Sequence, residues 1–311
     1  MNALHFDGET DQSNVSAAQS FFDSSRVVQL DDLDDPRARA YSNPKERTLR
    51  GESIFIAEGP LVVERLLKSR FKVESILATK KALDAFDALA LAPDDVPVYC
   101  VDEREAMNRL VGFEFHQGIL ATGRRAPLPT LTEGLDAYFA AASRREKDPT
   151  GAFSGSRRAW VVLPDATKPD NLGLTFRCAA ALDAEAVVLG ERCCDPFSRR
   201  ALRVSMGGAL QTPIYRAESL IDEIREAQAR WKLPFVATAL DRGAQPLADL
   251  ATCDALRDGA AFLFGNEYYG LSREMIDLCD YKTIIPMRGD VDSLNLGVSV
   301  GIVLYEYNRA S

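Results

Sequence analysis

The sequence predicts an α/β protein with two domains, a small N-terminal α/β sandwich followed by a parallel sheet flanked by helices. Short apolar runs alternate with helical segments along most of the chain, which is typical of parallel sheets covered by helices on both faces. A length of 311 residues is enough for two domains that each bury a core. Residues 127–157 are dense in proline and glycine and separate the two alternating series, which predicts a linker.

The N-terminal part divides into a tail and a domain. Residues 1–25 are rich in Ser, Asp, Gln and Asn and predict a disordered acidic tail, so the small domain covers residues 26–126. Within this domain, Pro60 and Asp102 mark the starts of two helices, the proline as a first helical residue and the aspartate as an N-cap. The predicted strands are 54–57, 73–78, 96–101 and 118–122, and the predicted helices are 60–70, 80–90 and 102–110.

The second alternating series predicts a C-terminal domain over residues 158–311. Its last helix is apolar nearly all round, and a helix without a polar face must be buried, either inside the domain or against another subunit. A further helix is possible at 131–145, inside the linker. The predicted strands are 160–163, 186–189, 213–215, 235–239, 261–264 and 283–286, and the predicted helices are 171–182, 218–231, 272–279 and a closing one from residue 293.

Charge is unevenly distributed along the chain. The net charge is −9, and residues 1–35 hold eight acidic residues against Arg26, which accounts for seven of these charges. The remainder is near neutral and contains local arginine groups, among them Arg199, Arg200 and Arg203. Judged singly, such groups are most often ordinary solvated charge. A near-neutral body nevertheless leaves room for a surface that binds nucleic acid phosphates.

Composition argues against several classes of protein. The six cysteines include no CxxC pair, and His5 and His116 are the only histidines, so we expect neither disulfides nor a metal site. No apolar run approaches the roughly 18 residues of a membrane span, and the N-terminus lacks a basic region followed by an apolar one. We therefore expect a cytoplasmic protein with no membrane association.

Three polar, glycine-containing segments follow predicted strands of the C-terminal domain. They are residues 169–173 with Arg177, residues 264–272, and residues 285–295. Open α/β sheets bind their ligands at the carboxyl ends of strands, which is where these segments are expected. No GxGxxG follows the first strand, so a nucleotide cofactor would be held differently from the usual dinucleotide crevice.

Together these segments resemble the three motifs of the SpoU/TrmH branch of the SPOUT RNA methyltransferases, over residues 159–309. The first motif is matched by Asn171, Gly173 and Arg177, the second by residues 265–267 with 270–272, and the third by residues 285–287 with 293–295. A further family stretch is matched by Ser198, Arg200, Arg203, Ser205 and Gly207. Residues 46–124 resemble the small substrate-binding domain of many members. Asp183 and Tyr268 depart from the pattern, because each stands where the family commonly has glycine.

The resemblance implies transfer of a methyl group from S-adenosylmethionine to a ribose 2′-hydroxyl in tRNA or rRNA. It also implies a homodimer joined through the C-terminal domains and a deep trefoil knot in each of them. The implied cofactor-binding residues are Thr238, Gly265, Ile285, Met287 and Leu294, and the implied RNA-binding residues are Ser198, Arg200 and Arg203. The implied catalytic residues are Arg177, Asn171, Glu267, Ser293 and Asn295.

Two of these assignments have a physical interpretation beside the family one. Glycine at 265 would let the backbone approach a ligand closely, because it has no side chain. Arg177 matches the residue proposed as a base in relatives, but a guanidinium stays protonated and has no acceptor while charged. We therefore expect Arg177 to bind a phosphate or polarise the 2′-oxygen, and to act as a base only if its proton is displaced.

Structural roles and other functions remain open at this point. Asn171 and Ser293 are each candidates for a helix N-cap, and Glu267 is a candidate partner for an arginine. The alternative function is a non-catalytic RNA-binding protein that retains the methyltransferase fold, against which the intact motif residues count. A third hypothesis is a small-molecule enzyme of the doubly wound class, and the missing GxGxxG motif counts against it.

Overall fold

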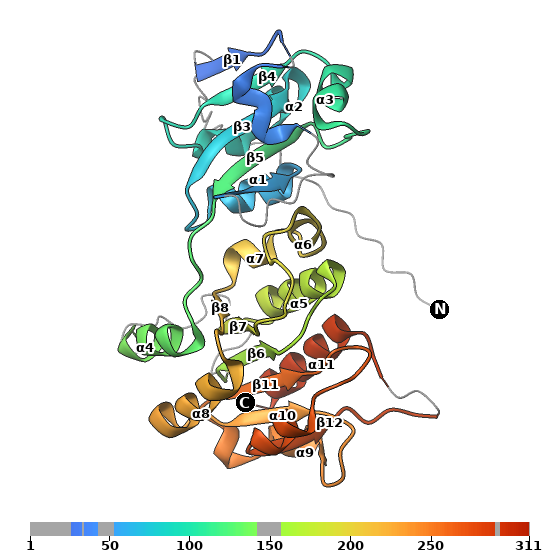
Figure 1. Cartoon of the computed structure of the whole chain (residues 1–311). Helices are drawn as coiled ribbons and strands as arrows, with labels where there is room; N and C mark the ends of the chain where they lie inside the picture. The colour runs from blue at the N-terminus through green and yellow to red at the C-terminus, as the bar shows by residue number, and fades with distance from the viewer. Residues whose placement is uncertain (1–25, 33, 43–52, 142–156, 290–292, 311) are drawn as a thin grey trace, which may run out of the picture.

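The computed structural model describes residues 26–32, 34–42, 53–141, 157–289 and 293–310 (Figure 1). The predicted tail, residues 1–25, lies outside the described residues. So do residues 142–156 of the predicted linker. Two sheets, one in each half of the chain, organise the described part. No helix among the described residues is long and apolar enough to cross a membrane.

The N-terminal sheet has five strands in the order β1-β4-β3-β5-β2. They are β1 (Val27–Gln29), β2 (Ile54–Glu58), β3 (Val73–Thr79), β4 (Val98–Val101) and β5 (Ile119–Arg124). Strands β1, β3 and β4 are parallel, whereas β5 runs antiparallel to both β2 and β3. The sequence predicted four of these strands. It did not predict β1, because only three residues pair and acidic residues follow them closely.

Helical segments cover both faces of this sheet. Strand alternation sends Phe55 and Ile76 toward α1 (Pro60–Leu67) and the 3-10 helix η3 (Asp87–Leu91), which follows α2 (Lys80–Ala85). It sends Ile56 and Leu77 toward α3 (Arg104–Val111) and the 3-10 helix η2 (Pro36–Tyr41). The sequence did not predict η2, although its Tyr41 is fully buried and shares a 2.7 Å hydrogen bond with the hydroxyl of Ser75.

The predicted aspartate cap of α3 is wrong. The helix begins at Arg104 with Glu103 in the N-cap position, and Glu103 makes no capping hydrogen bond. The Asp102 carboxylate instead accepts a 2.9 Å hydrogen bond from Gln29 Nε2, which joins it to β1. The side chain of Asp102 therefore makes a tertiary hydrogen bond instead of the helix cap that the local sequence predicted.

The C-terminal sheet has seven strands, all parallel, in the order β10-β12-β9-β11-β6-β7-β8. This confirms the predicted parallel sheet. Its strands are β6 (Ala159–Leu163), β7 (Ala186–Leu189), β8 (Ile214–Arg216), β9 (Phe235–Thr238), β10 (Gln245–Pro246), β11 (Ala260–Phe264) and β12 (Tyr281–Ile284). The sequence did not predict β10, which has only two residues at the sheet edge.

Helices cover both faces of the C-terminal sheet, as the sequence predicted (Figure 1). One face carries α5 (Pro169–Ala181), α6 (Arg199–Val204), α7 (Gly208–Gln211), α9 (Leu247–Ala251), the 3-10 helix η5 (Asp254–Leu256) and α11 (Leu296–Arg309). The other carries α4 (Leu131–Ala141), α8 (Leu220–Trp231) and α10 (Arg273–Leu278). Helix α4 belongs to this core although it lies within the predicted linker, and residues 142–145 of the predicted helix are outside the described part.

The closing helix is only half buried. It begins at Leu296, three residues later than predicted, and packs along α5. Its Val300, Val303 and Leu304 are buried in the core. Its other side exposes three large apolar side chains at helical spacing: Val298 (44%), Ile302 (36%) and Tyr305 (56%).

An aromatic and ionic contact joins the two halves of the chain. Phe197 stacks on Phe55 with ring centroids 5.2 Å apart and meets Phe71 edge-on at the same distance. Beside these rings, Arg199 Nε donates a 2.5 Å hydrogen bond to the buried carboxylate of Glu58. One continuous apolar cluster therefore extends from the N-terminal sheet into the C-terminal domain, with α6 and α7 between them (Figure 1).

Candidate active site

A pocket of about 430 Å³ opens at the carboxyl ends of β9, β11 and β12. The loops that follow these three strands form most of its wall, together with the start of α11. The five residues proposed to bind a cofactor all line it: Thr238 ends β9, Gly265 follows β11, Ile285 and Met287 follow β12, and Leu294 precedes α11. Ligands bind at this end of the strands in open α/β sheets.

Glycine at 265 has a different reason from the predicted one. A Cβ built there would lie 2.4 Å from the backbone carbon of Gly270 and 2.5 Å from the nitrogen of Leu271. The close approach is therefore between two stretches of this chain's own loop, which also pair through the Asn266–Gly270 bridge. Glycine is required to fold the loop tightly against β11.

A chain of amide hydrogen bonds connects α5, the β11 loop and α11. Asn171 Nδ2 donates to Oε1 of Glu267, and Asn295 Nδ2 donates to Oδ1 of Asn171 at 2.8 Å. Asn295 Oδ1 in turn accepts from the backbone N–H of Gly297 at 3.0 Å. Three of the predicted catalytic residues thus meet at one point, and Ser293 and Glu267 also line the pocket.

The second carboxylate oxygen of Glu267 is buried without a hydrogen-bond partner among the described residues. A buried, unpaired carboxylate oxygen is costly unless a ligand supplies a donor. Glu267, which lines the pocket, therefore carries one costly unpaired oxygen that is shielded from solvent.

The three structural roles considered from the sequence are wrong. Asn171 is the third residue of α5, where it cannot be the N-cap. The N-cap of α11 is Asn295 and not Ser293, because Asn295 accepts the hydrogen bond from Gly297. Glu267 makes no ion pair with an arginine among the described residues, and its partner is Asn171.

Arg177 lies apart from this cluster. It is exposed on α5, six residues after Asn171, so the helical twist turns it to another side of the helix. It does not line the pocket, and within the described part of the chain it forms no hydrogen bond or ion pair. One subunit alone therefore does not bring Arg177 to the other predicted catalytic residues.

The three predicted RNA-binding residues surround α6. Ser198 is its N-cap and accepts from the backbone N–H of Ala201 at 3.3 Å. Arg200 is exposed and forms a two-pronged ion pair with Asp170 at the start of α5. Arg203 lies 3.6 Å from Glu58 at the contact between the two sheets.

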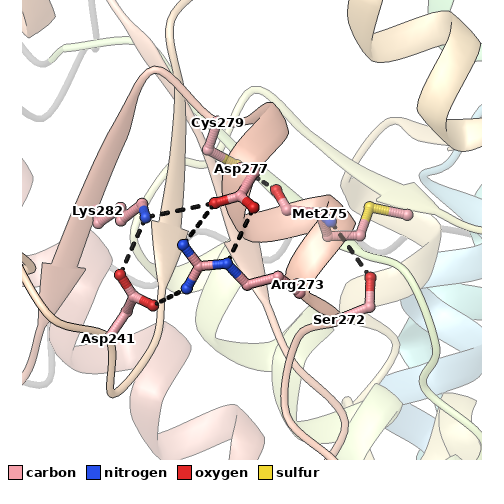
Figure 2. A network of polar contacts seen from close by, with 7 residues as sticks. All are labelled: Asp241, Ser272, Arg273, Met275, Asp277, Cys279 and Lys282. Atoms are coloured by element: carbon pink, nitrogen blue, oxygen red, sulfur yellow. Dashed lines mark hydrogen bonds and ion pairs between the residues drawn. The ribbon is translucent and has the colours of Figure 1, made fainter.

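A polar network that the sequence did not indicate supports one wall of the pocket (Figure 2). Asp241 lies just after the pocket residue Leu240 and pairs with Arg273 at 2.6 Å and with Lys282 at 3.0 Å. Arg273 and Lys282 both reach Asp277 as well. The hydrogen bond from Lys282, foremost, lowers the pKa of Asp241 below its usual range. The network ties the β9–β10 loop to α10 and β12.

Two tyrosines and a lysine at the pocket edge were likewise not assigned a binding role from the sequence. Tyr268 and Tyr269 line the pocket and project into solvent. Lys168 Nζ donates to the Tyr268 hydroxyl at 2.7 Å and lies 4.4 Å from the centre of its ring. No cluster of three or more His, Cys, Asp or Glu residues suited to a metal was found in the described ranges.

Comparison with known proteins agrees with the motifs. The model of the SpoU rRNA methylase family matches residues 158–305, and that of the RNA 2′-O ribose methyltransferase substrate-binding domain matches residues 56–128. A tRNA/rRNA methyltransferase of Mycobacterium bovis is 32% identical over 292 residues, which cover 91% of this chain and 92% of that protein. The chain belongs to the SpoU methylase family. This also confirms the family resemblance of the C-terminal motifs.

Relatives with more specific names resemble this SpoU methylase over less of its length. The 23S rRNA (guanosine-2′-O-)-methyltransferase RlmB of Acinetobacter baylyi is 30% identical, over 66% of this chain and 76% of that protein. Among solved structures, an AdoMet-bound rRNA methyltransferase from Sinorhizobium meliloti is 24% identical with a TM-score of 0.69. It covers 91% of this chain and 98% of its own. That likeness establishes the shared fold.

Proposed function

We propose that this protein transfers a methyl group from S-adenosylmethionine to a ribose 2′-hydroxyl of rRNA or tRNA. The observation that carries the proposal is the pocket itself, where motif residues after β11 and β12 meet Thr238 at the end of β9. The names of the relatives support it, since RlmB is a ribose methyltransferase of 23S rRNA. We place this reaction in the cytoplasm.

The pocket suits the cofactor in size and chemistry. Its volume of about 430 Å³ falls in the range of small-molecule sites, roughly 300–1,000 Å³. Phe264, Leu271 and Ile285 offer apolar contact, and the loop backbones offer donors and acceptors to an adenosine. Glu267 lines the same wall. When bound, S-adenosylmethionine supplies an activated methyl group.

The reaction needs the 2′-oxygen in line with the sulfonium methyl carbon. An oxygen–carbon bond forms as the carbon–sulfur bond breaks, and the hydroxyl proton leaves to a base or to water. We propose that Asn171, Glu267, Ser293 and Asn295 hold the ribose, since the first, second and fourth are already fixed by hydrogen bonds to one another. Preorganised groups of this kind position a reactant without further reorganisation.

We propose that Arg177 acts across a homodimer interface. Helix α11 packs against α5, and Cys178, the residue after Arg177, donates through Sγ to the carbonyl of Gly297 at 3.3 Å. A two-fold contact that buries the exposed apolar stripe of α11 would bring Arg177 of one subunit toward the pocket of the partner subunit. The start of α11 forms part of the wall of that pocket. The exposed position of Arg177 in a single chain fits this arrangement.

The remaining assignments concern RNA contact and chain path. We propose that the RNA binds to the N-terminal domain and to the surface around α6, which includes Ser198, Arg200 and Arg203. Arg200 would then exchange its ion pair with Asp170 for one with an RNA phosphate. We also propose the trefoil knot implied by the family. Ile285, Met287, Ser293 and Leu294, on either side of residues 290–292, line the same pocket as the loops after β9 and β11.

The decisive experiment is ribose-methylation mapping of total RNA from strains with and without the gene. One or more 2′-O-methyl sites should vanish in the deletion strain and return when purified protein and S-adenosylmethionine are added to its RNA. Binding of RNA with no methyl transfer, and an unchanged methylation map, would instead support the alternative of a non-catalytic RNA-binding protein.

A further inference from the structure

The most exposed large apolar side chains in the described part of the protein stand at the pocket. Tyr269 is 88% exposed and Tyr268 is 70% exposed, and Leu240, at 59%, lines the same pocket. Exposing aromatic rings to water carries a cost, and a cluster of them beside a binding pocket is typical of a contact surface. Both tyrosines directly follow Glu267, the residue with the unpaired buried oxygen.

The loop that carries these rings is held firmly. Asn266 and Gly270 exchange two backbone hydrogen bonds, of 2.8 and 3.2 Å, and the Asn266 side chain accepts a further one from the N–H of Tyr268. The Asn266 amide also donates to the carbonyl of Asp165. With the close backbone packing at Gly265, these contacts present the two rings outward on a short rigid turn.

The two rings are not equivalent. Tyr268 is held by Lys168, which both donates to its hydroxyl and lies over its ring. Tyr269 makes only a tilted ring contact with Tyr268, at 6.3 Å and 51°, and its hydroxyl has no hydrogen bond to any described residue. Tyr268 is therefore a fixed support, and the ring of Tyr269 is free to be covered.

The partner must be planar and apolar and must carry negative charge nearby. Sequence-specific RNA recognition mostly targets single-stranded loops, bulges and ends, whose unstacked bases stack on aromatic side chains. Aromatic side chains supply this contact to unpaired bases without regard to sequence. The Lys168 ammonium beside them, at the start of α5, can meet an adjacent phosphate.

We propose that Tyr269, supported by Tyr268 and Lys168, is the stacking platform for an unpaired base of the RNA at the methylation site. Tyr269 is thus a positioning residue that fixes the nucleotide while its ribose lies at the pocket wall that Glu267 and Ser293 line. This inference rests on the proposed function and deepens it, because it assigns the substrate's single-stranded character to residues of this chain.

The test compares Tyr269→Ala with Tyr269→Phe in the full-length protein. Total RNA from the deletion strain is the substrate, and transfer of a labelled methyl group from saturating S-adenosylmethionine is measured. Tyr269→Ala should raise the KM for RNA at least about fivefold, the effect of losing one base–aromatic stack. Tyr269→Phe keeps the ring and should stay within about twofold of the wild type. Calorimetry should give the same S-adenosylmethionine affinity for all three proteins.

Four outcomes would overturn the inference. If the wild type is active and Tyr269→Ala has an unchanged KM for RNA, the stacking role of Tyr269 would be refuted and the proposed function would stand. Weaker S-adenosylmethionine binding by the same factor would mean that the ring contacts the cofactor. A Tyr269→Ala variant that is monomeric by light scattering would assign the ring to a subunit contact. A wild type that methylates no RNA would remove the proposed function and this inference with it.

Discussion

At the scale of single residues, Arg177 is the sharpest case, because its motif position implies catalysis while it is exposed and does not line its own subunit's pocket. A guanidinium is a poor base but a strong donor to an oxyanion or phosphate. Its contribution should therefore show in turnover and leave both folding and cofactor binding unchanged.

We predict that Arg177→Ala lowers kcat by about 100-fold or more, as is typical for loss of a positioned acid–base or charge-stabilising group. The affinity for S-adenosylmethionine, measured by calorimetry, should stay near the wild-type value. Arg177→Lys is the matched control, since it keeps the charge and loses the planar set of donors. Substantial rescue by lysine would favour phosphate attraction. Near wild-type activity of a folded Arg177→Ala would assign the residue to the solvated surface.

Asn295 has two roles that substitution can separate. Its Oδ1 caps α11 through Gly297, and its Nδ2 holds Asn171. We predict that Asn295→Ala loses about 1 kcal/mol of stability with the cap and also loses turnover. Asn295→Ser keeps a capping oxygen but is too short to reach Asn171, so it should retain stability and still lose turnover. Thermal unfolding and methyl-transfer assays measure the two effects, and equal activity of Asn295→Ser and wild type would argue against the amide network in catalysis.

At the scale of elements, the loop between β9 and β10 is shaped by ionic contacts (Figure 2). Asp241 fixes it to Arg273 on α10 and to Lys282 on β12, next to Leu240 in the pocket wall. The hydrogen bond from Lys282, foremost, lowers the pKa of Asp241, so the carboxylate stays charged to a lower pH than an ordinary aspartate. The stability it contributes is present above the normal aspartate pKa and is lost as the pH falls through the lowered one.

We predict that Asp241→Asn weakens S-adenosylmethionine binding several-fold at pH 7, because the loop that forms one wall of the pocket loses its anchor. Asp222→Asn is the matched control, since Asp222 pairs with Arg225 on the exposed side of α8. Calorimetry measures both affinities. The loop would be independent of this network if the two variants bound the cofactor equally well.

The exposed stripe of α11 is the second feature at this scale. Val298, Ile302 and Tyr305 share one side of the helix beside α5. We predict that Ile302→Glu yields a monomer at micromolar concentration, because a dimer contact would bury its charge without a partner. Light scattering measures the mass. Leu91→Glu, at an exposed leucine of the N-terminal domain, is the control and should leave the mass unchanged. A dimeric Ile302→Glu would place the interface elsewhere.

At the scale of the whole molecule, the two sheets are coupled through α6. Phe197 lies between Phe55 and Phe71, and Arg199 reaches the buried Glu58, so the N-terminal domain is seated on the methylase domain near the start of α5. A packed contact of this kind sets the distance between an RNA-binding surface and the pocket.

We predict that Phe197→Ala costs about 3–5 kcal/mol where the domains meet, as for other buried aromatic truncations. Calorimetric unfolding should then separate into two transitions. The KM for RNA should rise, while S-adenosylmethionine affinity should hold because neither Phe197 nor its ring partners line the pocket. Phe139→Ala is the control, because Phe139 packs against the other core cluster. This variant should still unfold in a single calorimetric transition.

The sequence by itself determined the elements whose signals are local. The alternating runs predicted four of the five N-terminal strands, the parallel C-terminal sheet and the helices on both of its faces, because strand and helix periodicity is encoded in neighbouring residues. The motifs also indicated which loops would gather, and the five residues proposed for the cofactor do line one pocket. These features depend little on distant contacts.

Only the tertiary structure decided the features that depend on which segments meet. Strand β1 forms because it pairs with β4, and η2 is held by the hydrogen bond of Tyr41 with Ser75. Asp102 bonds to Gln29 and does not cap α3. The same holds at the pocket, where Gly265 is required by the backbone of Gly270. It also holds for Arg177, whose solvent-facing position follows from the packing of α5 against α11. Local sequence sets each segment's preference, but the free energy of burial and pairing between distant segments selects the final arrangement.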